Sequence, residues 1–330
     1  MQTLQHATLA PHLDQLAVGG EGIVYRVSSM PRMVLKQYKE AQRPQLDTVA
    51  LSELVQVVDQ WDAGDKAHVM SRTAWPSTLV ADPRGVCGFL MGEVEDSYYG
   101  RYGLRANPRR VLCDWNQLIY QSTAPTPAHL ISDMPQVSVE GIVQLLQDLA
   151  ATVQALHRNS IVIGDMSGKN LIWTVGPNRV FMIDCDSFHF DGRRGACSHK
   201  ESPGWVDPVL GGRTTDRESD IYKLGVAAYR ALAHDAHSAV TQAQVAQTLT
   251  GTSVPSSLVG LISASVDTAG RPTATEWCTT LGELYKFGGR PAIGVRSVPK
   301  ASTSESVPTS ASSSVPRTPR PRINLSGRPG

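Results

Sequence analysis

The stretch that decides the fold is GDMSGKNLIW, residues 164–173, which follows the apolar run IVI. Asp165 and Asn170 lie five positions apart in it, and Asp184 comes fourteen residues after Asn170, at the end of the apolar run VFMI. Either segment alone favours a turn, because Asp, Gly, Ser and Asn are the usual turn residues between strands. Together they place hard oxygen ligands at the ends of two neighbouring strands, a donor set that suits a divalent metal ion.

The residues before this stretch predict a small, strand-rich part. Residues 16–27 (LAVGGEGIVYRV) form short apolar runs separated by glycines, and residues 33–38 (MVLKQY) alternate apolar and polar side chains as a half-buried strand does. Residues 47–61 have apolar positions at helical spacing, and residues 73–94 contain further strand-like runs. We therefore expect strands around one helix.

The residues after about Val94 predict a mostly helical part. Residues 95–110 are a polar stretch that bears aromatic residues, followed by a helical pattern at 111–120 and a Pro-rich break at 124–136. Residues 138–159 form an amphipathic helix with one apolar face, made of Ile142, Leu145, Leu146, Leu149, Val153 and Leu156. The expected fold class is α+β with two lobes, a β-rich N-lobe at about 10–93 and a larger, mostly helical C-lobe at about 94–287. A cleft between unlike lobes is a natural place for a ligand.

Composition excludes several classes of protein. The 330 residues are 41% hydrophobic and 18% charged with a net charge of +1, so no overall field favours nucleic acid or an anionic membrane. The five cysteines are widely spaced, which indicates neither a disulfide framework nor a zinc site. The N-terminus lacks the pattern of a secretory signal, and no apolar run is long enough to span a membrane. We expect a cytoplasmic protein.

The last 43 residues, 288–330, differ from the rest of the chain. They are rich in Ser, Pro and Arg and lack periodicity, and from Gly289 onward they carry seven Lys or Arg residues and one acidic residue, Glu305. Such a composition cannot bury enough apolar surface to offset chain entropy. We expect a folded domain at 1–287 and a disordered basic tail at 288–330, which could bind anionic partners without specificity for nucleic acid.

The motifs resemble those of the protein-kinase superfamily, in the same order along the chain. IVIGDMSGKN resembles the catalytic loop H-R-D-x-x-x-x-N, and IDCDSF (183–188) resembles the segment around D-F-G. The resemblance implies that Asp165 is the catalytic base and that Asn170 and Asp184 hold Mg²⁺, with Mn²⁺ as an alternative. The resemblance is greatest to a bacterial or phage group with G-D in the catalytic loop and D-x-D-S-F in place of D-F-G.

The resemblance extends upstream to the expected ATP site. LAVGGEGIVYRV resembles the Gly-rich loop, and Lys36, twelve residues past Val24, resembles the strand lysine that binds the α/β-phosphates. Glu53 on the next helix would hold Lys36, and Glu40 is a nearby alternative. The residues expected to bind ATP are Gly19, Gly20, Gly22, Val24, Lys36, Glu53, Met91, Glu93 and Val94, of which Glu93 and Val94 would meet the adenine through their backbone.

Downstream segments complete the resemblance. SDIYKLGV implies that Asp220 accepts hydrogen bonds from the backbone of the catalytic loop, and GRPTATEW implies that Arg271 supports the activation segment. Val209 stands where A-P-E has its glutamate, so Asp207 becomes the plausible partner of Arg271. Ser202 is a possible autophosphorylation site.

Five departures from the family pattern surround the expected site. Ile163 and Gly164 replace the usual His and Arg, which argues against control through a phosphorylated activation loop. Cys185 and Asp186 replace Phe and Gly, and Asp186 is either an additional metal ligand or a turn cap. Lys169 could reach the γ-phosphate in place of the lysine that usually follows the catalytic Asp by two positions.

The expected activity is that of an ATP-dependent serine/threonine-protein kinase acting on an unidentified protein substrate, with no membrane partner. One alternative is a nucleotide-binding pseudokinase that serves as a regulatory scaffold. Another is a small-molecule kinase of the aminoglycoside-phosphotransferase type, which the Gly-rich loop and the segments SDIYKLGV and GRP disfavour.

Overall fold

A computed structural model of the chain describes residues 3–121, 127–197 and 201–287. All of them belong to the first of two units into which the chain divides, Met1–Ile293 and Gly294–Gly330. The tail predicted at 288–330 lies outside the described residues.

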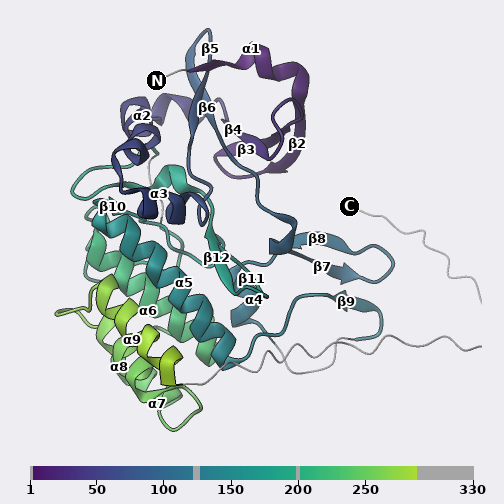
Figure 1. The fold of residues 1–330 in the computed structure, drawn as a ribbon. Helices are drawn as coiled ribbons and strands as arrows, with labels where there is room; N and C mark the ends of the chain where they lie inside the picture. The colour runs from purple at the N-terminus through teal and green to yellow at the C-terminus, as the bar shows by residue number, and fades with distance from the viewer. Residues whose placement is uncertain (1–2, 122–126, 198–200, 288–330) are drawn as a thin grey trace, which may run out of the picture. The chain divides into compact units, whose positions relative to one another are not determined.

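The N-terminal part is a six-stranded sheet with the order β1-β5-β6-β4-β3-β2 (Figure 1). β1 runs parallel to β5, and every other pair is antiparallel. The strands are β1 (Leu4–Gln5), β2 (Leu13–Val18), β3 (Gly22–Val27), β4 (Met33–Tyr38), β5 (Thr78–Asp82) and β6 (Gly85–Gly92). β4 lies inside the sheet, which explains why the side chain of Lys36 can be buried between neighbours.

Three α-helices accompany this sheet, where the sequence predicted one. They are α1 (His6–Leu9), α2 (Thr48–Val57) and α3 (Ala63–Met70), with 3-10 turns at Ala10–His12, Arg43–Gln45 and Val58–Gln60. Asp47 begins α2 by accepting from the amides of Val49 and Ala50, as an N-cap aspartate does. The short helices α1 and α3 escaped prediction because eight residues or fewer show too little apolar periodicity.

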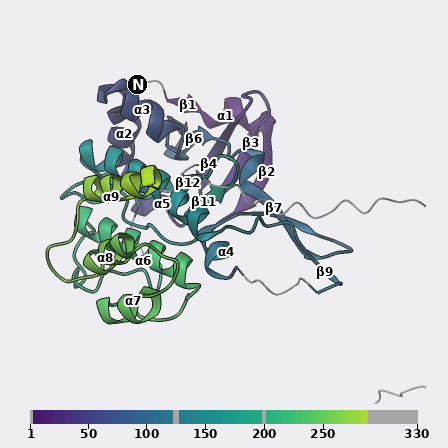
Figure 2. The ribbon, with the colours of Figure 1, turned by 60° about the horizontal axis from the view of Figure 1, so that its bottom comes forward.

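A second sheet of three strands interrupts the expected helical part. Its order is β8-β7-β9, with β7 (Tyr99–Leu104), β8 (Arg109–Leu112) and β9 (Leu130–Ser132), preceded by a 3-10 turn at Asp96–Tyr98. In Figure 2 it projects away from the helices. The sequence did not predict it, because arginines and glycines occupy many of its positions and most of its side chains are not buried, so apolar alternation is weak.

The rest of the C-terminal part is mainly helical, as expected. The helices are α4 (Trp115–Ile119), α5 (Val139–Arg158), α6 (Arg217–Ala233), α7 (Gln242–Leu249), α8 (Ser256–Ser265) and α9 (Ala274–Phe287). Two small antiparallel pairs join β10 (Ile161–Val162) to β13 (His189–Phe190) and β11 (Leu171–Thr174) to β12 (Arg179–Met182), with a 3-10 turn at Cys185–Ser187. In the described part of the chain, no helix combines the length and apolar character that crossing a membrane requires.

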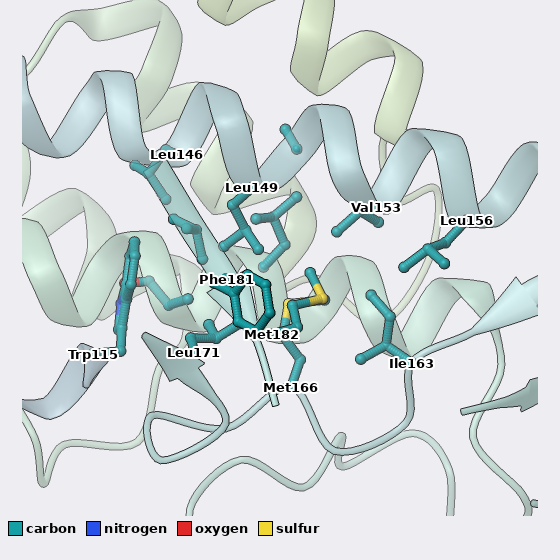
Figure 3. Close-up of a cluster of buried hydrophobic side chains, with 14 of the residues drawn as sticks. Trp115, Leu146, Leu149, Val153, Leu156, Ile163, Met166, Leu171, Phe181 and Met182 are labelled. Carbon is teal, nitrogen blue, oxygen red and sulfur yellow. The ribbon is translucent and has the colours of Figure 1, made fainter. Parts of the chain in front are cut away.

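Helix α5 anchors the stretch that contains Asp165. All six residues of its predicted apolar face are buried. Figure 3 shows Ile163 and Met166, from the two sides of Asp165, directed towards Leu149, Val153 and Leu156 of this helix. Because its neighbours at 163 and 166 are held in the core, the backbone at Asp165 is fixed although its own side chain is only half-buried. The observed architecture is therefore mixed α+β, with a β-rich N-terminal sheet and a helical C-terminal part.

Candidate functional site

The loop that carries Asp165 is held by helix α6. Asp220, which is fully buried, accepts hydrogen bonds from the amides of Ile163 (2.8 Å) and Gly164 (3.0 Å), so the predicted role of Asp220 is confirmed. His157 Nε2 lies 3.0 Å from the same carboxylate. Gly164 has φ +75°, a backbone conformation that glycine adopts without the steric cost of a side chain, which accounts for a glycine directly before Asp165.

Asp165, Asn170 and Asp184 lie next to one another. Asn170 Nδ2 donates to Asp165 Oδ2 (3.1 Å) and to the Asp165 carbonyl (3.0 Å). The Asn170 carbonyl accepts from the amide of Ile183 (2.9 Å), which places Asp184 beside Asn170. Asp184 has φ +57°, a strained conformation for a non-glycine residue of the kind that gathers at functional sites, and its side chain is 56% exposed. The Asn170 amide oxygen and the Asp184 carboxylate can thus serve as metal ligands.

Lys36 comes from β4 and reaches this group of residues from the N-terminal sheet. It is buried, and its Nζ lies 2.7 and 2.9 Å from the two carboxylate oxygens of Asp186 and 3.3 Å from Asp184 Oδ1. Burial acts to lower the pKa of Lys36, but the carboxylates of Asp186 and Asp184 outweigh it, so the pKa lies above its usual value. Lys36 therefore carries its charge throughout the physiological range.

Asp186 has a role that the sequence did not predict. Both of its oxygens bind Lys36, and Oδ2 also accepts from the Tyr38 hydroxyl (2.8 Å). The side chain is 2% exposed. Asp186 is therefore the residue that holds Lys36, a role beside the two that we considered, an additional metal ligand and a turn cap. Tyr38 stands two positions from Lys36 on the same face of β4, a spacing that could have indicated a shared partner.

Glu53, the expected partner of Lys36, lies elsewhere. Its carboxylate accepts from Arg193 Nη1 (2.7 Å), and the two side chains are 43% and 61% exposed. The prediction that Glu53 holds Lys36 is therefore wrong for this structure. The nearer carboxylate of Asp186 supplies the opposite charge that the buried ammonium requires. The alternative residue Glu40 pairs with Arg84 (2.6 Å) at the surface.

The glycine-rich segment is the turn between β2 and β3. Gly19 N donates to the Gly22 carbonyl (2.9 Å), and Gly20 faces open space. A Cβ on Gly22 would lie 2.7 Å from the Gln37 carbonyl, so this glycine also permits β3 to approach β4. Val24 is partly buried and pairs in register with Lys36.

Glu21, in the same turn, is a residue that sequence reasoning missed. Its Oε2 lies 3.9 Å from Lys36 Nζ, and the side chain is 47% exposed. Partial burial raises the pKa of Glu21; Lys36 opposes the shift and the carboxylates of Asp186 and Asp184 add to it. The turn therefore directs a carboxylate towards the lysine that was expected to bind phosphate.

The segment that joins the two parts begins after β6. Met91 is buried, and the Glu93 amide donates to the Arg32 carbonyl (2.9 Å) while the Glu93 side chain binds Arg26 (3.0 Å). Within the described part of the chain the amide of Val94 has no hydrogen-bond acceptor. It is a backbone donor in this segment that a ligand could use.

Lys169 and Ser202 complete the surroundings of Asp165. Lys169 is exposed, and no hydrogen bond joins it to Asp165 among the described residues. Burial raises the pKa of Asp114, and the charge of Lys169 is a small influence against that shift. The Ser202 hydroxyl donates to Asp165 Oδ2 (3.2 Å), and the Ser202 amide lies 3.4 Å from Oδ1. The segment after residue 200 therefore contacts the carboxylate predicted to be the base.

Arg271 and Asp207 form the pair that the sequence indicated. Arg271 Nη2 donates to Asp207 Oδ1 (2.9 Å), Nη1 donates to Oδ2, and both side chains are almost fully buried. The prediction that Asp207 replaces the missing glutamate as partner of Arg271 is confirmed. The pair fixes the segment around Asp207 to the start of α9.

One further set of ligand-type atoms lies close together in the described residues. Carboxylate oxygens of Glu21 and Asp186 and the thiol of Cys197 are within 4.8 Å of one another. Burial, followed by the charge of Asp186, raises the pKa of Cys197 to about 12, so the thiol stays protonated. Because Lys36 already supplies a cation to Asp186, we do not regard this set as a metal site.

Comparison with known proteins does not assign the chain to a family. No protein-family model matches the chain, and a search of curated proteins finds no match. Function has to be inferred from the residues and their geometry.

Proposed function

We propose that this chain is a protein kinase with the two-lobed protein-kinase fold, which transfers the γ-phosphoryl group of ATP to a Ser or Thr hydroxyl of a protein substrate. The observation that carries the proposal is the contact between Lys36 Nζ and Asp184 Oδ1 (3.3 Å), which joins residues 148 positions apart beside Asp165 and Asn170. Four polar residues of the kinds that phosphoryl transfer requires thus meet where the sheet contacts the helical part.

The nucleotide would bind along the glycine turn and the segment after β6. The amide of Val94, which lacks an acceptor in the described chain, would donate to the adenine, and Val24 and Met91 offer apolar surface. Lys36 would move part of its hydrogen bonding from Asp184 to the α/β-phosphates while Asp186 keeps it in place. Glycines at 19, 20 and 22 allow the backbone to approach the phosphates closely.

The donor set fits a divalent cation. Asp184 offers a half-exposed carboxylate and Asn170 an amide oxygen, and both are hard ligands of the kind that Mg²⁺ and Mn²⁺ prefer. Such an ion neutralises charge on the β- and γ-phosphates. Asp186 would not contribute, because Lys36 and Tyr38 occupy its oxygens.

Asp165 would act on the substrate hydroxyl. Its carboxylate accepts the hydroxyl proton as the oxygen forms a bond to the γ-phosphorus, and the bond from that phosphorus to the β–γ bridging oxygen breaks, so that ADP leaves with the electron pair. Asn170 keeps the carboxylate oriented through its hydrogen bond to Oδ2. Lys169 would approach the γ-phosphate only by moving its exposed side chain, so it is a secondary candidate.

The test is transfer of label from γ-labelled ATP, with Mg²⁺, to the chain itself and to a generic protein acceptor. We expect Asp165→Ala to lower transfer by at least about 100-fold, the range for loss of a general base, and Asp184→Ala to abolish most transfer because it removes the proposed metal ligand. Asp59→Ala is the matched control, since Asp59 is an exposed aspartate that pairs with Lys66 at the surface. Absence of transfer by the unaltered chain, or equal transfer by the Asp165→Ala variant, would refute the proposal.

A nucleotide-binding pseudokinase is the second candidate, and one observation favours it. Three carboxylates, of Asp186, Asp184 and Glu21, already surround the ammonium of Lys36 and compete with phosphate for it. This candidate predicts that Mg²⁺ and ATP raise the Tm of the protein by mass action without any transfer of phosphate. The same raised Tm in Asp165→Ala would support it.

A further inference from the structure

Helix α6 carries a buried cation, Lys223, that has no role in the proposed reaction as described above. Lys223 is fully buried, and the residues that follow it in the helix, Leu224 to Tyr229, are buried as well. Its Nζ donates to the Gly164 carbonyl and lies 2.5 Å from Glu201 Oε1. The lysine therefore joins the residue before Asp165 to the residue before Ser202.

The energetics of this lysine do not favour a role in stability alone. Removing an ammonium from water costs several kcal/mol, and a buried ion pair is often no more stable than apolar side chains of similar volume. A Met or Leu at position 223 would suit the apolar surroundings at lower cost. The gain from Lys223 has to come from the positions of the groups that it contacts.

Those groups surround Asp165 on both sides. Asp220 and Lys223, three positions apart on α6, bind the amide and the carbonyl of Gly164 respectively. Through Glu201, the same lysine fixes the segment whose Ser202 donates to Asp165 Oδ2. The backbone before Asp165 and the hydroxyl in contact with its carboxylate thus share one anchor.

We propose that Lys223 is a positioning residue that sets the orientation of the Asp165 carboxylate, by holding the Gly164 carbonyl and the Glu201–Ser202 segment together. This inference rests on the proposed kinase function. It also means that the chain's own Glu201 anchors the segment, so the segment needs no added phosphate to contact Asp165.

The test compares Lys223→Met with Arg230→Met. Arg230 is a matched control because it is a second buried cation on α6. It holds the same segment through the Gly204 carbonyl (2.9 Å) and the ring of Trp205 (4.8 Å). Among the described residues it has no hydrogen bond or ion pair with Gly164 or Glu201. We expect Lys223→Met to lower kcat about 10- to 100-fold with little change in the KM for ATP, as for a misplaced catalytic group. Arg230→Met should change Tm and leave kcat within about twofold.

A double-mutant cycle checks the path through Glu201. Glu201→Gln removes the charge and keeps the shape, and the combined Lys223→Met, Glu201→Gln variant should be no slower than Lys223→Met alone, because the two residues act as a unit. Additive losses in kcat, or equal losses in Lys223→Met and Arg230→Met, would overturn the proposal.

Amide hydrogen exchange separates this proposal from the kinase function. The amide of Ser202, which points to Asp165 Oδ1, and the loop 163–170 should exchange faster in Lys223→Met than in Arg230→Met. If the unaltered chain transfers no phosphate, the proposed function fails and the exchange result still decides whether Lys223 orders Asp165. Unchanged exchange in Lys223→Met would overturn the positioning role even in an active enzyme.

Discussion

Replacing Asp186 with Asn removes the charge that holds Lys36 and nearly preserves the shape of the side chain. The bonds at risk are those to Lys36 (2.7 and 2.9 Å) and to the Tyr38 hydroxyl (2.8 Å), all buried. Loss of one partner from a buried ion pair costs about 3–5 kcal/mol. Because Asp184 stays 3.3 Å from the ammonium, we expect the lower end, about 3 kcal/mol.

The measurable consequences are a lower Tm and slower transfer. At about 2 °C per kcal/mol for a large domain, Tm should fall by roughly 6 °C. Lys36 would then depend on Asp184, which the proposed reaction needs for the metal, so we expect kcat to fall about 10- to 100-fold. Because the pKa of Lys36 is raised in the folded state, the stability that its pair with Asp186 contributes is present below about pH 10 and is lost only at higher pH. The difference in Tm between the unaltered chain and Asp186→Asn should therefore be constant from pH 7 to 9.

Glu53→Gln is the matched control, since Glu53 is the residue that the sequence assigned to Lys36. Its pair with Arg193 is exposed and is worth about 0–1 kcal/mol, so Tm should move by at most about 2 °C and kcat should hardly change. Differential scanning fluorimetry and labelled-ATP transfer, measured on both variants, decide the matter. Loss of transfer in Glu53→Gln with transfer retained in Asp186→Asn would show that Lys36 uses Glu53 in the working enzyme, and our account of Asp186 would be wrong.

Three further predictions follow from single contacts. Glu21→Gln should bind ATP more tightly in titration calorimetry, because it removes a carboxylate that competes with phosphate for Lys36. The pKa of Glu21 is raised in the folded state, so its ionised form destabilises the fold, and the substitution should raise Tm at pH 7 but not at pH 4. An unchanged Tm at pH 7 would contradict this. Asp207→Asn should lower the free energy of unfolding by about 3–5 kcal/mol in urea, because it leaves Arg271 charged and buried; a loss below 1 kcal/mol would count against a buried pair. Cys197 should react slowly with iodoacetamide at pH 8, since its pKa is about 12, and Asp186→Asn should speed the reaction; fast labelling of the unaltered chain would refute this.

Local patterns in the sequence were sufficient for the elements whose geometry is set by neighbours along the chain. Helix α5 and its buried face follow from apolar residues at helical spacing, strand β3 from a short apolar run bounded by glycines, and strand β4 from its alternation. The resemblance of SDIYKLGV to a kinase segment implied that Asp220 accepts hydrogen bonds from the loop before Asp165, and the structure shows them at Ile163 and Gly164. The short helices and the three-stranded sheet β8-β7-β9 were not predicted, because few of their residues are buried or regularly spaced.

The partners of buried charges were decided by tertiary structure. Lys36 could have met Glu53, Glu40 or a residue after Asp184, and only the folded chain brings Asp186 within 2.7 Å of it. Lys223 looks in sequence like an exposed helical lysine, yet α6 is enclosed and the lysine binds Gly164 and Glu201. Spacing along one element predicts which face a side chain takes, whereas an ion pair depends on which distant segment fills the space opposite that face. The sequence by itself therefore proposed Asp165, Asn170 and Asp184 as site residues, and the tertiary structure determined what holds them and Lys36 in place.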